Sequence, residues 1–309
     1  MPLPNRKGDR MALPPLYKYL DVHGAKLTLG NRTFKHAKPS DFKDTEDLTI
    51  QGIFPEEIET ALKRASQGML DVIFTHLHAA PTCASPMREK LAAIQAALRA
   101  DPGLAARMKA EIPKGALDGV YDVAHMHALA ESTVKGVNEF MQGWRVLCVT
   151  THKDSEKMWS GYAENHKGIA LRIEPNVAKD SKFQKFEPVV YRAKRPPLHD
   201  DTLEFVAGSV FGDKDARSKA MMEKIIYAKT LDWQHEGEYR VAIPLRQGED
   251  PWNTLPYHPE EVTELYLGAA MTDADKEDIL GKAKAVNPGM AVFQAVLGSG
   301  GKIAFEPRN

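Results

Sequence analysis

Hydrophobic and polar residues alternate in HEGEYRVAIPL at 235–245, and a period of two is typical of β-strands. LYKYL near the start has the aromatic content of a short strand, and RVLCVTT in the middle has the apolar character of a buried strand. The residues expected to form strands are 16–20, the stretch from 33 that ends at Pro39, 145–151, 168–174, 189–191, 238–245, 262–268, 290–297 and 302–305. The GSGG sequence between the last two is expected to form a hairpin turn.

From Pro55 the apolar residues change to a helical spacing, because Ile58, Ala61 and Leu62 fall at i, i+3 and i+4. Similar spacings continue to residue 142, so residues 55–142 are expected to form a helical insertion. Further helices are predicted over 155–166, with Asp154 or Ser155 as the cap, over most of 201–232, and over 272–285.

Strands and helices follow one another irregularly and no internal repeat is visible, which favours an α+β fold with a mixed or antiparallel sheet. We expect a flexible N-terminus at residues 1–15 because this stretch is polar and rich in proline. Residues 16–309 are expected to form a single α+β domain that carries the helical insertion at about 55–142.

Composition narrows the class of protein. The 309 residues include 41 Lys and Arg against 42 Asp and Glu, and this balance gives no long-range field that would favour nucleic acid or anionic lipid. The two cysteines are too few for a disulfide framework and indicate a reducing compartment. The sequence has no secretory signal and no stretch of the length that crosses a membrane, so a cytoplasmic location without membrane contact is expected.

The segment HEGEYRVAIPL at 235–245 carries the first candidate chemistry. If it is one strand, Glu236, Glu238 and Arg240 share a face. Acids two residues apart repel each other unless a cation or a hydroxyl-rich ligand lies between them. A solvated strand surface is the simpler interpretation, whereas a carboxylate beside an arginine can also bind a ribose hydroxyl and stabilise positive charge as a glycosidic bond breaks.

An aromatic stripe lies on the predicted helix in MWSGYAENHKGIALRI. Trp159, Tyr162, Ala163 and His166 follow one another at helical spacing and lead directly into a predicted strand. This face could pack the helix on the sheet, which is the commoner role of such a stripe, or it could stack on a planar ligand.

LYKYL, AKPSDFKDTED, MWSGYAENHKGIAL and HEGEYR together resemble a widespread bacterial family whose function is unknown. The resemblance covers residues 16–48 and 145–268 and skips the helical insertion. Family members usually read F-N-D-P-F-D where this chain has FKDTED, of which Phe42, Asp44 and Asp47 match.

The order of these motifs is similar to that of ADP-ribosyltransferases, and the resemblance implies a split sheet with NAD as the substrate. It implies that Glu238 is the catalytic glutamate, which stabilises the oxocarbenium-like ribose as nicotinamide departs. It also implies that Glu236 orients the acceptor and takes its proton, as in an E-x-E signature. The residues expected to bind NAD are Tyr17, Lys18, Tyr19, Trp159, Ser160, Tyr162 and Arg240.

The same resemblance implies a macromolecular acceptor for the ADP-ribose, and protein and nucleic acid are both open. By analogy the chain would be a bacterial toxin or defence factor, for which an inhibitor or antitoxin protein would be a partner. For the helical insertion, two roles stay open, which are recognition of the acceptor and recognition of the inhibitor.

Two alternatives stay open beside the transferase. A metal-dependent nuclease is suggested by His76 with His78, His125 with His127, and the group Asp41, Asp44 and Asp47. Both histidine pairs fall in predicted helices, where residues i and i+2 point about 200° apart, so no metal site is predicted. The other alternative is a nucleotide-sensing or protein-binding module without turnover.

Overall fold

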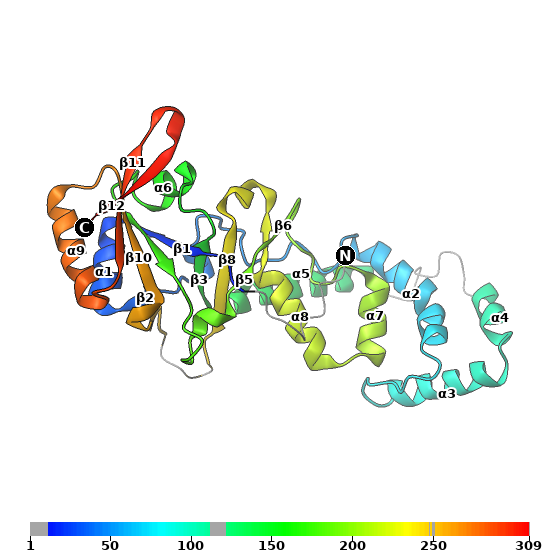
Figure 1. Cartoon of the computed structure of the whole chain (residues 1–309). Helices are drawn as coiled ribbons and strands as arrows, with labels where there is room; N and C mark the ends of the chain where they lie inside the picture. The colour runs from blue at the N-terminus through cyan, green and yellow to red at the C-terminus, as the bar shows by residue number, and fades with distance from the viewer. Residues whose placement is uncertain (1–11, 112–121, 247, 249–250, 309) are drawn as a thin grey trace. The chain divides into compact units, whose positions relative to one another are not determined.

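The structure is a computed structural model that describes residues 12–111, 122–246, 248 and 251–308 (Figure 1). Most of the predicted flexible terminus, residues 1–11, lies outside the described residues. The chain divides into two compact units. The sheet unit comprises the described residues up to Thr45, Gly143–Tyr191 and the described residues from Lys229 onward, and the helical unit comprises those of Glu46–Gln142 and Arg192–Ala228.

An eight-stranded sheet forms the centre of the sheet unit (Figure 1). The strand order is β12-β11-β10-β4-β1-β3-β8-β5. Neighbouring strands run antiparallel except β10 and β11, which are parallel, so the predicted α+β class with a mixed sheet is confirmed. In chain order the strands are β1 (Leu16–Leu20), β3 (Trp144–Thr150), β4 (Ile169–Ile173), β5 (Glu187–Pro188), β8 (Glu238–Pro244), β10 (Val262–Leu267), β11 (Ala291–Leu297) and β12 (Ile303–Arg308).

One row of residues crosses five of these strands. Glu264 lies opposite Arg172, Arg172 opposite Tyr17, Tyr17 opposite Thr150, and Thr150 opposite Glu238. Residues that lie directly opposite each other in a sheet point to the same side. The row therefore belongs to one face, which we call the α6 face because α6 (Glu156–Tyr162) packs on it through Met158 and Trp159.

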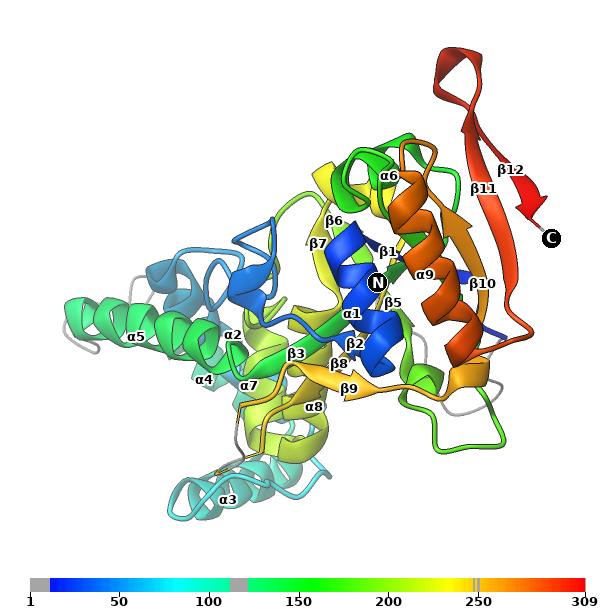
Figure 2. The same cartoon turned by 90° about the vertical axis from the view of Figure 1, so that its left-hand side faces the viewer.

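The opposite face is apolar and is covered by two helices, α1 (Val22–Asn31) and α9 (Asp273–Val286), which lie side by side (Figure 2). Helix α1 is absent from the sequence prediction. Its segment VHGAKLTLGN contains two glycines and a weak apolar stripe, and only Ala25, Thr28 and Leu29 are buried. The Asp21 side chain accepts a hydrogen bond from the Gly24 amide and caps the helix start.

Two pairs of short strands complete the sheets. β2 (Thr33–Lys35) pairs with β9 (Thr254–Pro256), and β6 (Val190–Arg192) pairs with β7 (Ala228–Thr230). β6 overlaps the strand predicted at 189–191, whereas β7 differs from the sequence prediction, which extended a helical region to residue 232. Tyr191 lies on β6 and Lys229 on β7, and both belong to the sheet unit.

The helical unit contains the helices of the predicted insertion and two further ones. They are α2 (Ile58–Thr75), α3 (Met87–Ala100), α4 (Leu104–Glu111), α5 (Val123–Met141), α7 (Thr202–Phe211) and α8 (Lys214–Ile226). Ile73, Leu91 and Leu98 form a small buried cluster among the first three of these. None of the described helices is long and apolar enough to cross a membrane.

The hairpin between β11 and β12 confirms the predicted turn, because the two strands are antiparallel and Ser299–Gly301 connects them. The short helix α6 begins as expected after Ser155, whose side chain accepts a hydrogen bond from the Met158 amide. It ends at Tyr162, earlier than predicted. Glu164, Asn165 and His166 follow with positive φ angles, so His166 does not continue the helical stripe.

Candidate functional site

Glu236, Glu238 and Arg240 come together at the start of β8, but not as three residues of one strand. β8 begins at Glu238, whereas Glu236 ends the 3-10 helix Leu231–Glu236, and Gly237 joins them with a φ of 50°. The exposed fractions are 4% for Glu236, 4% for Glu238 and 0% for Arg240. The solvated strand surface considered from the sequence is therefore wrong.

Glu238 is held by two cations. The Arg240 side chain donates to it through Nε at 2.6 Å and through Nη2 at 3.0 Å, and the Lys229 Nζ donates to its Oε2 at 2.9 Å. Burial alone would raise the pKa of this carboxyl, but the charges of Arg240 and Lys229 more than offset burial. The pKa of Glu238 therefore lies well below its ordinary value, and the group is ionised at neutral pH.

Glu236 faces the same lysine from the other side. Its Oε2 accepts from Lys229 Nζ, and its Oε1 accepts from the hydroxyl of Tyr162, the last residue of α6. Burial, followed by the negative charge of Glu236, raises the pKa of the Tyr162 hydroxyl, so the phenol keeps its proton and remains a donor. The Lys229 amine thus bridges two buried carboxylates, and Tyr162 of α6 hydrogen-bonds to one of them, Glu236.

The backbone around the two acids is fixed by neighbouring strands. The Glu238 amide donates to the Tyr191 hydroxyl at 3.0 Å, and the Thr150 hydroxyl donates to the Glu236 carbonyl at 2.5 Å. Burial raises the pKa of Tyr191 to about 12. The Cys148 thiol also hydrogen-bonds Glu238, and burial together with that carboxylate raises the pKa of the thiol well above its usual value. Cys148 is therefore no thiolate nucleophile, as expected from its strand position.

Aromatic rings flank the charged groups. The Lys229 Nζ lies 4.9 Å from the centre of the Trp233 ring, and the Arg240 guanidinium lies 5.8 Å from that of Phe42. Lys43, the next residue, places its Nζ 4.1 Å from the centre of the Tyr162 ring. We call Glu236, Glu238, Lys229, Arg240 and Tyr162 the carboxylate cluster. The segment at Phe42 and Lys43 contacts two of its members, Arg240 and Tyr162.

The predicted NAD-binding residues of β1 do not join the carboxylate cluster. Lys18 points to the face covered by α1 and α9, where its Nζ donates to the Cys148 carbonyl at 3.0 Å. Burial lowers the pKa of this amine. Tyr17 and Tyr19 do lie on the α6 face, but they contact other residues there. The centres of the Tyr17 and Tyr266 rings are 5.9 Å apart, and the Tyr19 hydroxyl donates to the His152 carbonyl at 2.9 Å.

The side chains of Trp159 and Ser160 also make their contacts away from Glu236 and Glu238. Trp159 is fully buried, its Nε1 donates to the Lys153 carbonyl at 2.8 Å, and its ring is nearly parallel to that of His166 at 6.1 Å. Ser160 donates to Glu156 at 3.3 Å. Trp159 therefore holds α6 on the sheet, which is the packing role considered from the sequence. Of the predicted binding residues, the structure brings Tyr162 and Arg240 to the carboxylates.

Sequence reasoning missed Lys229, Tyr191 and Cys148 as members of this site. Lys229 lies in YAKTLDW, where the helical pattern of the preceding residues was extended too far. A weak signal was present, because a lysine shortly before an E-x-E segment is a natural counter-ion for it. Nothing in the local pattern distinguishes Lys229 from the other lysines nearby.

The histidine pairs considered as metal ligands occupy different structures. His76 and His78 both follow the last residue of α2, Thr75, whereas His125 and His127 lie on α5. The helical prediction was thus wrong for the first pair. Within the described part of the chain, no group of three or more His, Cys, Asp or Glu side chains is arranged to hold a metal ion.

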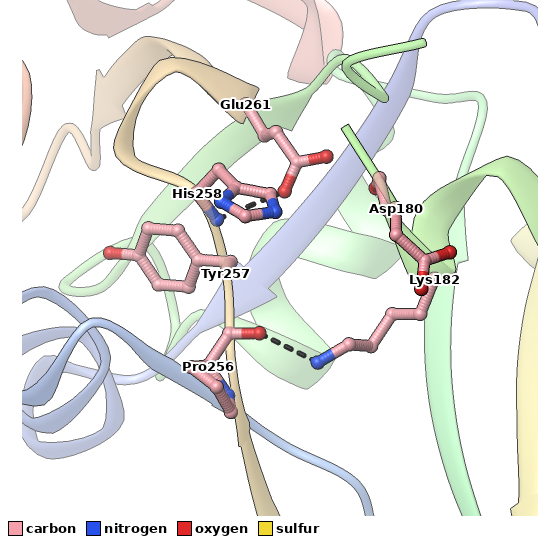
Figure 3. A pocket seen from close by; sticks show the side chains of 7 residues that line it. Asp180, Lys182, Pro256, Tyr257, His258 and Glu261 are labelled. Carbon is pink, nitrogen blue, oxygen red and sulfur yellow. Dashed lines mark hydrogen bonds between the residues drawn. The ribbon is translucent and has the colours of Figure 1, made fainter. Parts of the chain in front are cut away.

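A separate cleft of about 240 Å³ lies elsewhere in the sheet unit (Figure 3). Its lining includes Lys182, whose Nζ donates to the Pro256 carbonyl at 2.7 Å, and the buried Glu261, whose Oε2 accepts from the His258 amide at 3.0 Å. Lys182 and Glu261 are thus hydrogen-bonded to the backbone that lines the cleft. The cleft contains none of the residues predicted to act on NAD.

Comparison with known proteins gives one finding. A family model described as "Protein of unknown function (DUF2971)" matches residues 158–241. No curated protein and no solved structure matches the chain. The matched segment runs from α6 to the middle of β8 and therefore contains every member of the carboxylate cluster. The chain is thus similar to a family of unknown function over the segment that builds the site.

Proposed function

We propose that the protein is an NAD-dependent ADP-ribosyltransferase that acts on a macromolecular target through the carboxylate cluster. One observation carries the proposal: two motifs far apart in sequence, WSGYA on α6 and EGEYR at β8, meet in a single buried group of acids, cations and a phenol. These are the two motifs that the resemblance to ADP-ribosyltransferases assigns to the substrate and to catalysis.

The energetics of burial support a functional reason for this group. Taking two carboxylates and two cations out of water is costly, and replacing a buried ion pair with apolar residues often leaves a protein as stable or more so. Stability alone therefore gives little reason to keep Glu236, Glu238, Lys229 and Arg240 together. Strongly perturbed titratable groups held by specific partners are characteristic of functional sites.

The roles of the residues follow from their contacts. Glu238 is ionised, and Arg240 fixes its orientation through two donors, so the carboxylate can stabilise the positive charge that develops on ribose when nicotinamide leaves. Glu236 is the second base, suited to take a proton from the attacking nucleophile. Tyr162 holds Glu236 in place. For a ribose hydroxyl to reach Glu238 Oε2, it would replace Lys229, which now donates to that oxygen.

The test is the release of nicotinamide from NAD by the purified full chain. We expect Glu238→Gln to lower the rate by about 100-fold or more, because the charge that favours the transition state is removed. Glu264→Gln is the matched control, since Glu264 is also bound by an arginine and a tyrosine on the α6 face. Thermal unfolding of both variants checks that they fold.

Two outcomes would contradict the transferase. One is a wild-type chain that releases no nicotinamide in the presence of cell lysate as a source of acceptors. The other is a Glu238→Gln variant as active as Glu264→Gln. Labelled NAD would also show whether protein or nucleic acid receives the ADP-ribose. The same assay would show whether an inhibitor or antitoxin protein suppresses the transfer, which is expected if the protein is a cytoplasmic bacterial toxin or defence factor.

One feature favours a second candidate, a nucleotide-sensing or protein-binding module without turnover. Every carboxylate oxygen of Glu236 and Glu238 already accepts a hydrogen bond within the chain. A module of this kind would bind NAD, detected by calorimetry, without releasing nicotinamide. Binding and release measured on the same sample therefore separate the two candidates.

A further inference from the structure

Lys229 occupies a chemically distinctive position in the sheet unit. Its Nζ donates to Glu236 Oε2 and to Glu238 Oε2, the latter at 2.9 Å, and the side chain is 7% exposed. It comes from β7, and the 3-10 helix Leu231–Glu236 that follows delivers Glu236 to the same point. A potential nucleophile and a potential base therefore lie within one short segment of chain.

We propose that Lys229 is a modification site, at which the protein transfers ADP-ribose to its own side chain. The inference rests on the proposed function and adds an acceptor to it. In nucleosidyl transfer the nucleophile must lie beside the carboxylate that stabilises the ribose and beside the base that takes its proton. The Lys229 amine contacts both of these groups.

Proximity gives Lys229 an advantage over free acceptors. A nucleophile fixed by its own backbone loses little further freedom on reaching the reacting carbon, and intramolecular placement of this kind corresponds to effective concentrations of about 10⁵ M or more in favourable cases. Acceptors from solution must first bind. Self-modification should therefore proceed without any added target.

Other lysines of the sheet unit near the α6 face or β1 are engaged elsewhere. Lys18 donates to the Cys148 carbonyl, and Lys43 donates to the Gly161 carbonyl. Lys153 lies over the rings of Tyr266 and Phe305, 5.6 Å and 5.5 Å from their centres. Their contacts direct these three amines to carbonyls or rings, whereas those of Lys229 direct its amine to the two acids.

The reaction balances with groups already in place. The Lys229 ammonium gives one proton to the Glu236 carboxylate, and the lone pair that this frees forms a bond from nitrogen to the anomeric carbon of the nicotinamide-bearing ribose. The bond from that carbon to nicotinamide breaks, and its electron pair cancels the positive charge of the pyridinium ring. Neutral nicotinamide leaves, the product is a secondary ammonium on Lys229, and Glu236 returns its proton to water.

The experiment is to incubate the full-length wild-type chain with NAD alone, follow nicotinamide release, and map the product by peptide mass spectrometry. We expect one ADP-ribose unit on Lys229. Treatment with neutral hydroxylamine checks the linkage, because an amine-linked adduct survives and an ester on Glu236 or Glu238 is cleaved. This measurement needs no variant, so it does not depend on whether a substituted chain folds.

Two variants serve as controls. Lys229→Arg keeps the positive charge between the acids and should lose the lysine adduct, whereas Lys153→Arg should retain it. Nicotinamide release without modification of Lys229, or an adduct that maps to another lysine, would overturn the inference and leave the transferase standing. A wild-type chain that releases no nicotinamide either alone or with acceptors would overturn the proposed function, and the inference would fail with it.

Discussion

Two groups on the same face of the sheet share a chemistry and differ in their surroundings. In the carboxylate cluster, Glu238 is held by Arg240 with a tyrosine nearby, and in the second group Glu264 accepts from Arg172 Nη1 at 2.6 Å and from the Tyr266 hydroxyl. The side chains of Arg172 and Glu264 are 28% and 18% exposed, whereas those of Arg240 and Glu238 are 0% and 4% exposed. Arg172 also reaches Glu174, which is half exposed to water.

The difference lies in how each group compensates its charge. Water reaches the Arg172 pair more than it reaches the carboxylate cluster, so we expect the loss of Arg172 to cost less stability than the loss of Arg240. The two acids of the carboxylate cluster are buried and balanced by Lys229 and Arg240, so the loss of one member leaves the remaining buried charges out of balance. A buried group of this kind responds strongly to any ligand that replaces one member. This contrast supports the choice of the carboxylate cluster over the second group as the site.

Removing the arginine from each group should give the largest contrast. We expect Arg240→Met to lower the free energy of unfolding by about 3–5 kcal/mol, because Glu238 loses its bidentate partner in a buried position. Arg172→Met should lower it by about 1 kcal/mol or less. Urea unfolding at pH 7 measures both values, and equal losses would show that the two groups do not differ in kind.

After the arginine substitutions, a fall in pH should have the next largest effect on the stability that the carboxylate cluster provides. The folded-state pKa of Glu238 is depressed, so its ionisation stabilises the fold at pH values above the ordinary value of 4.5 and this contribution is lost as the pH falls through the lower, folded value. The stability advantage of the wild type over Glu238→Gln should therefore be constant between pH 7 and about pH 5 and shrink below that. Urea midpoints across this range test the sign, and an advantage that grows in acid would refute it.

The two tyrosines should give the smallest effects and the sharpest separation of stability from activity. Tyr162→Phe and Tyr266→Phe each remove one hydroxyl that donates to a carboxylate, so each should cost about 1–2 kcal/mol of stability. Only Tyr162→Phe should also slow nicotinamide release, because Glu236 loses the donor that orients it. Similar rates for the two variants would remove Tyr162 from the proposed mechanism.

The strands and the class of fold follow from the sequence because the composition and the periodicity of a strand are local properties. β1, β3, β4 and β10 fall where the pattern predicts them, within a residue or two. Alternation tells which residues share a face, but not whether another part of the chain covers that face. For this reason Glu238 and Arg240 were correctly paired, while their burial was left open between solvent and a site.

What the sequence could not predict depends on tertiary contacts. Helix α1 is held by α9 and the sheet, and its own apolar stripe is too weak to predict it. Lys18 was expected to bind NAD because the resemblance to ADP-ribosyltransferases implies a polar or basic residue on the first strand. Strand geometry sends its side chain to the face opposite that of Tyr17 and Tyr19. Lys229 reaches the acids only because β7 and the 3-10 helix after it bring the chain back to β8.

Gly237 contributes a backbone conformation to the E-G-E sequence, in addition to the charges of the two glutamates. Its φ of 50° belongs to the left-handed region, and a Cβ there would lie 2.5 Å from Nε2 of His152 and 2.8 Å from Oγ1 of Thr151. An alanine at this position would strain the backbone and push aside the side chains of His152 and Thr151. The turn that brings both acids to Lys229 therefore favours a residue without a side chain, and a search for related proteins should require the glycine as strictly as the glutamates.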